Sequence, residues 1–363
     1  MAQHRSSVAS SEDVSRLERV ADVQFVAPCR AALTVGGVGV FTTATVPAGT
    51  TLLAERPFAL TASWERRKHV CDWCMAEDEV SPYPLCCKSC GSVAYCSDAC
   101  ARSATRHSAL ECEAFAAFAA DDDDEGVADL VVQAIRILAH RHANVRTTPI
   151  PGTPLEVGYD DYRARLQNIA RTKRQEVAIK SAARVTLRVM PPEGRVTPGE
   201  LIEVLSRHQC NALGVTGVGG SELGLASCLG GMHLFNHSCM PNAVWDSRPL
   251  LPSPDDAGAG VAFALRALSD IPGGTEVFIC YAASAEGPAR RLQYLKDHYG
   301  FDCNCARCGC ADDPMGEAEL ADELDAMRCR CEGCGTGLSY PLLHEEGVRR
   351  CVHCGGDWEE EEY

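Results

Sequence analysis

Thiol groups recur in this sequence at short spacings that suit a tetrahedral zinc ion. One thiol follows the dipeptide Asn236-His237, and a Cys-x-Cys-x-x-Cys run comes well downstream. Together they supply four soft ligands, the number that one structural zinc ion takes: Cys239, Cys303, Cys305 and Cys308. Such a metal would fold the chain back, so that the segment just before the run would lie against Asn236-His237.

Aromatic residues near these thiols, and a pair of glycines much nearer the N-terminus, are candidates for binding or catalysis. Tyr281 ends an apolar run that begins at Glu276, and its hydroxyl could orient a reacting group, although most strand tyrosines only pack by their rings. Tyr299 and Phe301 come directly before the Cys-x-Cys run, where a metal would hold them in place. Upstream, Gly37-Val38-Gly39 would let the backbone approach a ligand, but such a pair of glycines alone is more often just a turn.

A denser array of cysteines lies nearer the N-terminus and offers ligands for two further zinc ions. A segment this short buries too little apolar surface to fold unaided, so metal would supply much of its stability. The ligands expected here are Cys71, Cys74, Cys87, Cys90, Cys96, Cys100, His107 and Cys112. Cys86 does not give the Cys-x-x-Cys spacing and is expected to be a spectator. For His107 the alternative is a surface histidine, with another group completing the site.

Two more Cys-x-x-Cys pairs near the C-terminus predict a small zinc ribbon over 326–358. The four thiols are Cys331, Cys334, Cys351 and Cys354. Cys329 and His353 are alternative ligands for the same ion.

The order of these motifs resembles that of a known enzyme family. The run Asn-His-Ser-Cys-x-Pro-Asn at 236–242, crossed by a segment that ends in Tyr281, is similar to the SET domain of protein lysine methyltransferases. The array over 71–112 resembles a MYND zinc module. A MYND module inserted in a split SET domain resembles the SMYD family, over about residues 25–310. That family commonly continues into a long helical C-terminal domain, whereas this sequence carries the ribbon cysteines.

The resemblance implies an activity, its cofactors and its site. The protein would be an S-adenosylmethionine-dependent protein lysine N-methyltransferase acting on histone or non-histone lysines, with Tyr281 orienting methyl group and amine. One zinc would be held by Cys71, Cys74, Cys96 and Cys100 and another by Cys87, Cys90, His107 and Cys112, which makes about three to four ions in all. Cofactor contacts would come from Gly37, Val38, Gly39, Asn211, His233, Asn236, His237, Tyr281, Tyr299 and Phe301. A satisfied core histidine is the alternative for His233.

The implied fold is α+β, a β-rich SET domain split by a zinc module and a helical insert. The expected parts are a disordered N-terminus 1–19, SET segments 20–66 and 200–300, a MYND module 67–113, a helical insert 114–199, a post-SET zinc segment 301–312 and the ribbon. Apolar spacing predicts an amphipathic helix over 126–143 and a second helix over 159–183. A third is predicted over 197–210, with Thr197 as N-cap, Pro198 at the first position and Glu200 reaching back. Strands are expected over 211–219, 261–265 and 276–280.

Composition and charge narrow the class of protein. Twenty-two cysteines, clustered in pairs and without a signal-peptide pattern, favour an intracellular zinc protein of cytoplasm or nucleus over a disulfide scaffold. No apolar run approaches the roughly 20 residues of a membrane span. The net charge of −16 counts against direct nucleic-acid binding and favours a protein substrate whose lysine lies in a basic segment.

Two other functions compete with methyl transfer. One is a catalytically silent, zinc-stabilised scaffold whose MYND module binds proline-rich peptides. The other is a DNA-binding zinc protein, which the absence of a basic recognition helix disfavours. Because silent relatives tend to lose the tyrosine or the Asn-His pair, and Tyr281 and Asn236-His237 are all present here, the enzyme is favoured.

Overall fold

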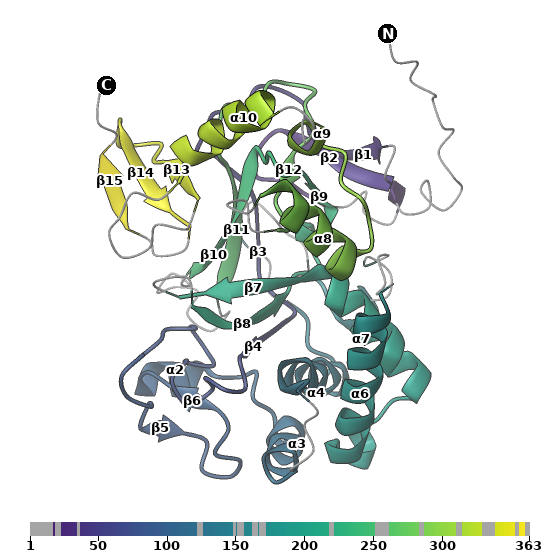
Figure 1. The fold of residues 1–363 in the computed structure, drawn as a ribbon. Coiled ribbons are helices and arrows are strands. Elements are labelled where there is room, and N and C mark those ends of the chain that lie inside the picture. Colours follow the sequence, from purple (N-terminus) through teal and green to yellow (C-terminus); the bar gives the residue numbers. More distant parts are fainter. Residues whose placement is uncertain are drawn as a thin grey trace.

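Small sheets form the middle of the molecule, and helices and a cysteine-rich module cover one end of them (Figure 1). The computed structural model describes residues 17–18, 23–34, 37–121, 126–147, 150, 156–161, 166, 172–217, 221–250, 261–282, 287–309, 314–328, 338–352 and 356–359. All further statements concern these residues.

Strands that precede the cysteine array pair with strands that follow the helices. The order β10-β11-β3 forms one sheet and β4-β8-β7 another, while β1 and β2 form an antiparallel pair. The bounds are β1 Cys29–Thr34, β2 Gly37–Thr42, β3 Thr51–Glu55, β4 Ala59–Ala62, β7 Ala212–Thr216, β8 Glu222–Ser227, β10 Ala243–Leu250 and β11 Ala262–Ala267. The β-domain is therefore assembled from two stretches of chain, and the strands predicted near 211–219 and 261–265 are confirmed.

The core of these sheets is made of alternate inward-facing apolar side chains. Val38 and Val40 of β2 pack with Leu52 of β3, Phe263 of β11 and Val277, all of them buried. Burying each side chain of this size contributes about 1.5–3 kcal/mol. The two halves of the split domain thus share one apolar core.

In the sequence, the cysteine-rich module and a group of longer helices separate the two halves, and in space they lie together at one end of the sheets (Figure 1). The module contains β5 Leu85–Cys86, β6 Ala94–Tyr95 and α2 Asp98–Ser103. The helices are α3 Ala109–Ala119, α4 Ala128–His142, α6 Lys173–Val189 and α7 Pro198–Asn211, with the short 3-10 turn η1 Pro192–Gly194 before the last. Their apolar faces form a second core with the module.

The helix predicted over 126–143 exists as α4, but the polar face expected of an amphipathic surface helix is buried as well. Every residue from Leu130 to His140 is buried, so the helix is enclosed on all sides. Some of its buried polar atoms have partners: Gln133 Nε2 donates to the Leu225 carbonyl, and His140 Nδ1 lies 2.8 Å from the Phe58 carbonyl oxygen, whereas Gln133 Oε1 and His140 Nε2 have no hydrogen-bond partner among the described residues. A buried helix needs such partners because an unpaired polar group would destabilise the interior.

The other two predicted helices, over 159–183 and 197–210, are present, but details of each differ from the prediction. In place of one helix over 159–183, residues 159–161 are helical and a separate helix, α6, begins at Lys173, where Thr172 and Gln175 form a capping box, and runs on to Val189 just before Pro191. The third has Thr197 as N-cap and Pro198 in its first turn as predicted. Glu200, however, accepts a hydrogen bond from the Tyr159 hydroxyl at 2.9 Å instead of reaching back to the cap.

The C-terminal third continues with short elements around the sheets. Its members are η3 Met232–Leu234, β9 Asn236–His237, β12 Phe278–Ile279, α8 Pro288–Tyr299, α9 Ala306–Gly309 and α10 Pro314–Ala326. A small antiparallel sheet, β13 Ser339–Pro341, β14 Val348–Cys351 and β15 Asp357–Glu359, packs beside β10 through the Tyr340 hydroxyl, 3.3 Å from the Asp246 carboxylate. Among the described helices, none has the length and apolarity that a membrane crossing requires.

A fully buried arginine on α4 ties the module, the helices and the sheet together. Arg136 Nε donates to Glu111 of α3 at 2.6 Å, and its Nη2 donates to both oxygens of Asp72 at 3.0 Å. Nη1 donates to the Leu60 carbonyl of β4 at 2.6 Å. The two carboxylates raise the pKa of Arg136 further against the opposing effect of burial, so the guanidinium stays charged. One side chain thereby connects three parts of the fold.

Substitution Arg136→Met tests this connection. It would leave the carboxylates of Glu111 and Asp72 in the interior without their counter-charge, so the free energy of unfolding should fall by about 3–5 kcal/mol. Urea titration of the zinc-loaded protein measures the change. The matched control is Arg146→Met, which removes the exposed pair with Glu156 and should cost about 0–1 kcal/mol. Equal losses in the two variants would contradict the assigned role.

Candidate active site and metal centres

Two short segments cross at the middle of the molecule, and the crossing fixes Tyr281. Strands β9 and β12 pair in parallel, with Asn236 opposite Phe278 and His237 opposite Ile279. Beyond the pair, the Tyr281 backbone N–H donates to His237 Nδ1 at 2.9 Å, and its hydroxyl donates to the Phe235 carbonyl at 2.6 Å. Both ends of the tyrosine are therefore bound to segment 235–237.

Asn242, which sequence reasoning did not select as a site residue, holds the same crossing from its other end. Its Nδ2 donates to the Glu276 carbonyl at 2.9 Å, and its Oδ1 accepts from the Phe278 N–H at 2.8 Å. The side-chain amide thus replaces a neighbouring strand for two backbone groups that would otherwise lack partners. Its place at the end of the Asn-His-Ser-Cys-x-Pro-Asn run was the available signal.

The thiols expected around Cys239 do come together. The sulfur atoms of Cys239, Cys303, Cys305 and Cys308 all lie within 4.8 Å of one another. Hydrogen bonding from Cys239 is the largest influence on Cys305 and lowers the pKa of its thiol to about 3, so the thiolate that a metal needs is available. Four sulfur ligands in a compact, partly buried group suit zinc.

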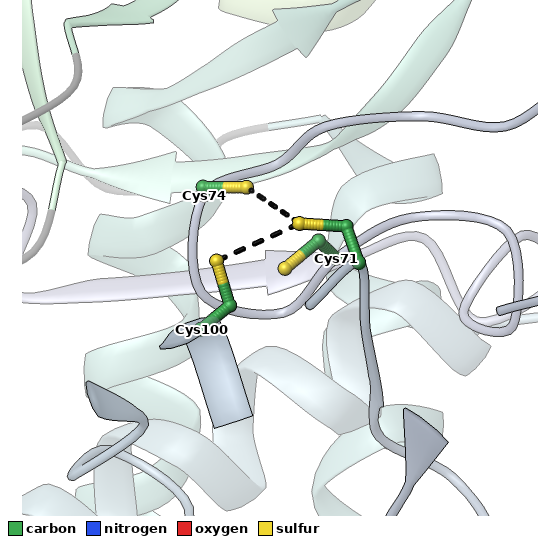
Figure 2. A group of neighbouring side chains, drawn as sticks. Cys71, Cys74 and Cys100 are labelled. Atoms are coloured by element: carbon green, nitrogen blue, oxygen red, sulfur yellow. Dashed lines mark hydrogen bonds between the residues drawn. The ribbon is translucent and has the colours of Figure 1, made fainter. Parts of the chain in front are cut away.

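The N-terminal array forms two separate clusters with the predicted membership. Cys71, Cys74, Cys96 and Cys100 make one, and Cys87, Cys90, His107 and Cys112 make the other, each with ligand atoms within 4.8 Å. Figure 2 shows the sulfur atoms of Cys71, Cys74 and Cys100 turned toward a common centre. The bond from Cys74 is the largest influence on Cys71 and lowers the pKa of that thiol to about 5. Each cluster could hold a zinc ion.

His107 is buried and oriented for metal binding, so the surface alternative does not describe it. Its Nε2 lies 3.6 Å from Cys90 Sγ within the cluster, and its Nδ1 lies 2.8 Å from the Glu111 carboxylate. A carboxylate at the second ring nitrogen fixes the tautomer that leaves the first nitrogen free for a metal. Since Glu111 also binds Arg136, this cluster is linked to α4. Cys86 is exposed and lies outside both clusters, as expected.

Aromatic rings from three segments gather around the crossing. The ring of Tyr281 lies 5.2 Å from that of His237 and 4.9 Å from that of Tyr299, between centroids. Phe301 lies 5.8 Å from His237. Tyr299 ends α8, Gly300 turns the chain in a left-handed conformation, and Phe301 then leads into the cysteine run. The prediction that the segment before the cysteine run lies against Asn236-His237 agrees with this arrangement.

A cavity of about 290 Å³ opens beside Tyr281. Four of the residues predicted to bind the cofactor line it together: Asn211, His233, Tyr281 and Tyr299. Phe235, Cys210 and Cys280 also contribute to its wall. Its size lies at the lower end of the range usual for small-molecule sites.

A larger cavity of about 930 Å³ shares walls with the first at Ala212, Gly214, Tyr294 and Tyr299. Its charged lining is acidic: Glu65, Asp129 and Glu222. Burial raises the pKa of Glu222, and the charge of Asp129 adds to this effect. The larger cavity therefore lies next to the first, and its carboxylates favour a cation.

Gly37-Val38-Gly39 forms the start of strand β2, beside the crossing, and is not in the wall of the 290 Å³ cavity. Gly37 has a φ of 124°, a conformation that favours glycine. The Val38 carbonyl accepts from Asn236 Nδ2 at 3.2 Å. Above Gly39, the place where a Cβ would stand is filled by the side chains of Glu276 and Asn236.

The predicted C-terminal ribbon falls largely outside the described residues. This holds for Cys331, Cys334 and Cys354, and for the alternatives Cys329 and His353. Cys351 is described, buried at the end of β14. The ribbon zinc therefore stays a prediction.

Comparison with known proteins assigns the family. A model of the SET domain matches residues 37–282. The histone-lysine N-methyltransferase ASHR1 of Arabidopsis thaliana is 24% identical over 324 residues, covering 88% of this chain and 62% of that protein. The histone-lysine N-methyltransferase SMYD3 of Mus musculus is 25% identical over 283 residues, covering 76% and 60%. The solved SET domain of LSMT bound to MeLysine and AdoHcy aligns with 13% identity and a TM-score of 0.38, over 88% of this chain and 63% of that one.

The chain therefore belongs to the SET domain family, and its inserted cysteine module places it with the SET and MYND domain proteins of the SMYD group. It spans about 60% of the length of the curated relatives described above.

Two buried histidines near the larger cavity predict a pH dependence of stability. Burial lowers the pKa of both His140 and His208 to about 4, and each is neutral in the folded protein. In the unfolded chain a histidine titrates near 6.5, so below that pH the unfolded state alone takes up protons. Stability is therefore lost as the pH falls from about 6.5 toward 4, by about 1.4 kcal/mol per pH unit and histidine.

Variant His208→Gln should remove one histidine's share of that slope. The free energy of unfolding from urea titrations between pH 7.5 and 5, with zinc in excess, measures it. His142→Gln, an exposed position at the end of α4, is the matched control and should keep the wild-type slope. A His208→Gln slope equal to that of wild type would contradict the assignment.

Proposed function

We propose that this protein is an S-adenosylmethionine-dependent protein lysine N-methyltransferase. The observation that carries the proposal is the double attachment of Tyr281 to segment 235–237, next to a cavity of suitable size. Bound S-adenosylmethionine supplies an electrophilic methyl group on a sulfonium. Polar groups at Asn211 and His233 and the ring of Tyr299 are the wall residues suited to hold it.

The reaction needs little covalent work from the protein. A bond forms between the lysine nitrogen and the methyl carbon as the methyl–sulfur bond breaks, sulfur keeps the electron pair, and the amine has lost its proton to solvent. In-line placement of the two reactants supplies much of the rate. The residues of the site therefore need to position an uncharged amine and to stabilise positive charge in transit.

Tyr281 has the geometry for this task. Its hydroxyl hydrogen is directed to the Phe235 carbonyl, which orients the oxygen so that it can act as an acceptor toward an amine N–H or a polarised methyl group. The oxygen is held before the substrate arrives, so no reorganisation is needed during the reaction. The side chains of Asn236 and His237, both in strand β9, support the site.

The acidic lining of the larger, 930 Å³ cavity supports a protein substrate whose target lysine lies in a basic segment. Glu65, Asp129 and Glu222 line the larger cavity, which shares wall residues with the Tyr281 cavity, and its lining contains no arginine or lysine among the described residues. Charges of opposite sign on substrate and cleft speed their encounter and discriminate against other partners. A proline-rich peptide partner at the zinc module and a location in cytoplasm or nucleus stay predictions.

Substitution Tyr281→Phe removes the hydroxyl and keeps the ring. Methyl transfer to lysine-containing protein should fall by about 10²–10³-fold, the loss typical of one preorganised polar group. Release of labelled methyl groups onto basic peptides measures the rate, while calorimetry shows that the cofactor still binds. Tyr159→Phe, which removes the hydroxyl that binds Glu200 on α7, should leave the rate unchanged.

Two outcomes would contradict the proposal in different ways. Unchanged turnover in Tyr281→Phe would remove this residue from the mechanism. A zinc-loaded wild-type protein that binds no cofactor would favour the silent scaffold.

A further inference from the structure

A buried carboxylate at the end of β3 takes no part in the metal centres or in the reaction described above. Glu55 is 8% exposed, and it is the last residue of the strand. Its Oε1 accepts from the Gly230 N–H at 3.2 Å, and its Oε2 accepts from the N–H groups of Gly231 at 2.5 Å and Met232 at 3.2 Å. Three consecutive backbone donors thus converge on one side chain.

A carboxylate in the interior destabilises a fold unless hydrogen bonds compensate for the lost water. Burial raises the pKa of the Glu55 carboxyl, and hydrogen bonds from Gly231, Met232, Gly230 and Cys228 oppose that rise. A carboxylate suits this place because both of its oxygens accept, so that it can serve several donors at once. A glutamine would offer a single oxygen and would bring an NH₂ group among the backbone donors.

The donors belong to the beginning of the turn η3, where backbone N–H groups have no partner within the turn itself. The N-cap residue of η3 is Gly231, so the turn has no side-chain cap of its own. Glu55, 176 positions away from Gly231 in the sequence, supplies the cap from the sheet. The Leu234 N–H then closes the turn by donating to the Gly231 carbonyl at 3.0 Å. The carboxylate therefore fixes the place where η3 begins.

The turn and the residue after it form part of the proposed site. Met232, His233 and Phe235 all line the 290 Å³ cavity. Phe235 follows the turn directly, and its carbonyl accepts the hydrogen bond from the Tyr281 hydroxyl at 2.6 Å. One short turn, 232–234, thus connects the carboxylate of Glu55 with the group that holds the tyrosine hydroxyl.

From this geometry we infer that Glu55 is a positioning residue for methyl transfer, because by capping η3 it sets the place of the Phe235 carbonyl and thereby of the Tyr281 hydroxyl. The inference rests on the proposed methyltransferase function and assigns a residue outside the wall of the 290 Å³ cavity. Without the carboxylate, three buried N–H groups lose their acceptor and the turn moves to find others. The Tyr281 hydroxyl moves with it, and a displaced positioning group lowers the rate.

A double-mutant cycle on kcat with Glu55→Gln and Tyr281→Phe tests this connection. In the wild-type background Glu55→Gln should lower kcat by about tenfold, the scale of loss for a misplaced reacting group. In the Tyr281→Phe background the hydroxyl is already absent, so the same substitution should change kcat by less than about twofold. Single-turnover transfer of labelled methyl groups to basic peptides, at saturating cofactor and peptide, measures the four rates.

Controls separate positioning from a general loss of stability. Asp246→Asn is the matched control, because it neutralises a second buried carboxylate of the same sheet, bound to the Tyr340 hydroxyl. This variant should lower the urea midpoint and leave kcat unchanged. Zinc content and the urea midpoint are measured on every sample. If Glu55→Gln does not fold, Glu55→Asp takes its place in the cycle, since it keeps the charge and withdraws it from the three donors by one methylene.

The outcomes separate the inference from the proposed function. A loss of kcat in the Glu55 variant that disappears in the Tyr281→Phe background would support the connection. Equal fold losses in the two backgrounds would overturn the inference, as would a wild-type kcat in the Glu55 variant. A zinc-loaded wild-type protein that transfers no methyl group would overturn the proposed function and this inference with it.

Discussion

The site depends on holding two remote segments against each other across a very short pairing. Strands β9 and β12 share only a two-residue parallel register, which cannot by itself keep residues 236 and 278 together. The thiol of Cys239 and the three thiols after Asp302 close the other side of the crossing. A metal shared by four ligands converts a weak contact into a fixed one, because binding energy at such a site is also folding energy. The position of the Tyr281 hydroxyl therefore depends on this metal-linked contact.

A few strong interactions also join the inserted module and helices to the sheets. Arg136 reaches Glu111, Asp72 and the β4 backbone, and Glu111 in turn orients His107 in a zinc cluster. Since Asp72 lies inside the Cys71-x-x-Cys74 turn, both clusters of the module are joined to one helix. The module is thereby attached to the β-domain by charge and metal as well as by apolar packing.

Local spacing carried most of what could be predicted. Ligands of one zinc ion recur at short intervals, so the candidate ligands of all three described clusters follow from spacing, whereas the division of the array between two ions followed from the resemblance to the MYND module. The crossing with Tyr281 followed from resemblance. What could not be predicted depends on partners distant in sequence. The enclosure of α4 requires knowing that Arg136 meets Glu111, and the hydrogen bond of Glu200 with Tyr159 joins residues 41 positions apart in the sequence. The space over Gly39 is visible only when Glu276 is already in place.

The central claim is that the metal bound by the four thiols holds the crossing of β9 and β12 together. Amide hydrogen exchange on a Cys305→Ser variant tests it most directly, because the substitution removes a ligand from that cluster and leaves the other two clusters intact. The Ser238 amide donates to the Ile279 carbonyl and the Tyr281 amide to His237, so both report on the crossing. We expect the amides of Ser238 and Tyr281 to lose protection together in the variant, while the amides of the β10-β11 pair keep their protection. Unchanged protection of Ser238 and Tyr281 in the variant would show that the crossing stands without its metal and would contradict the account.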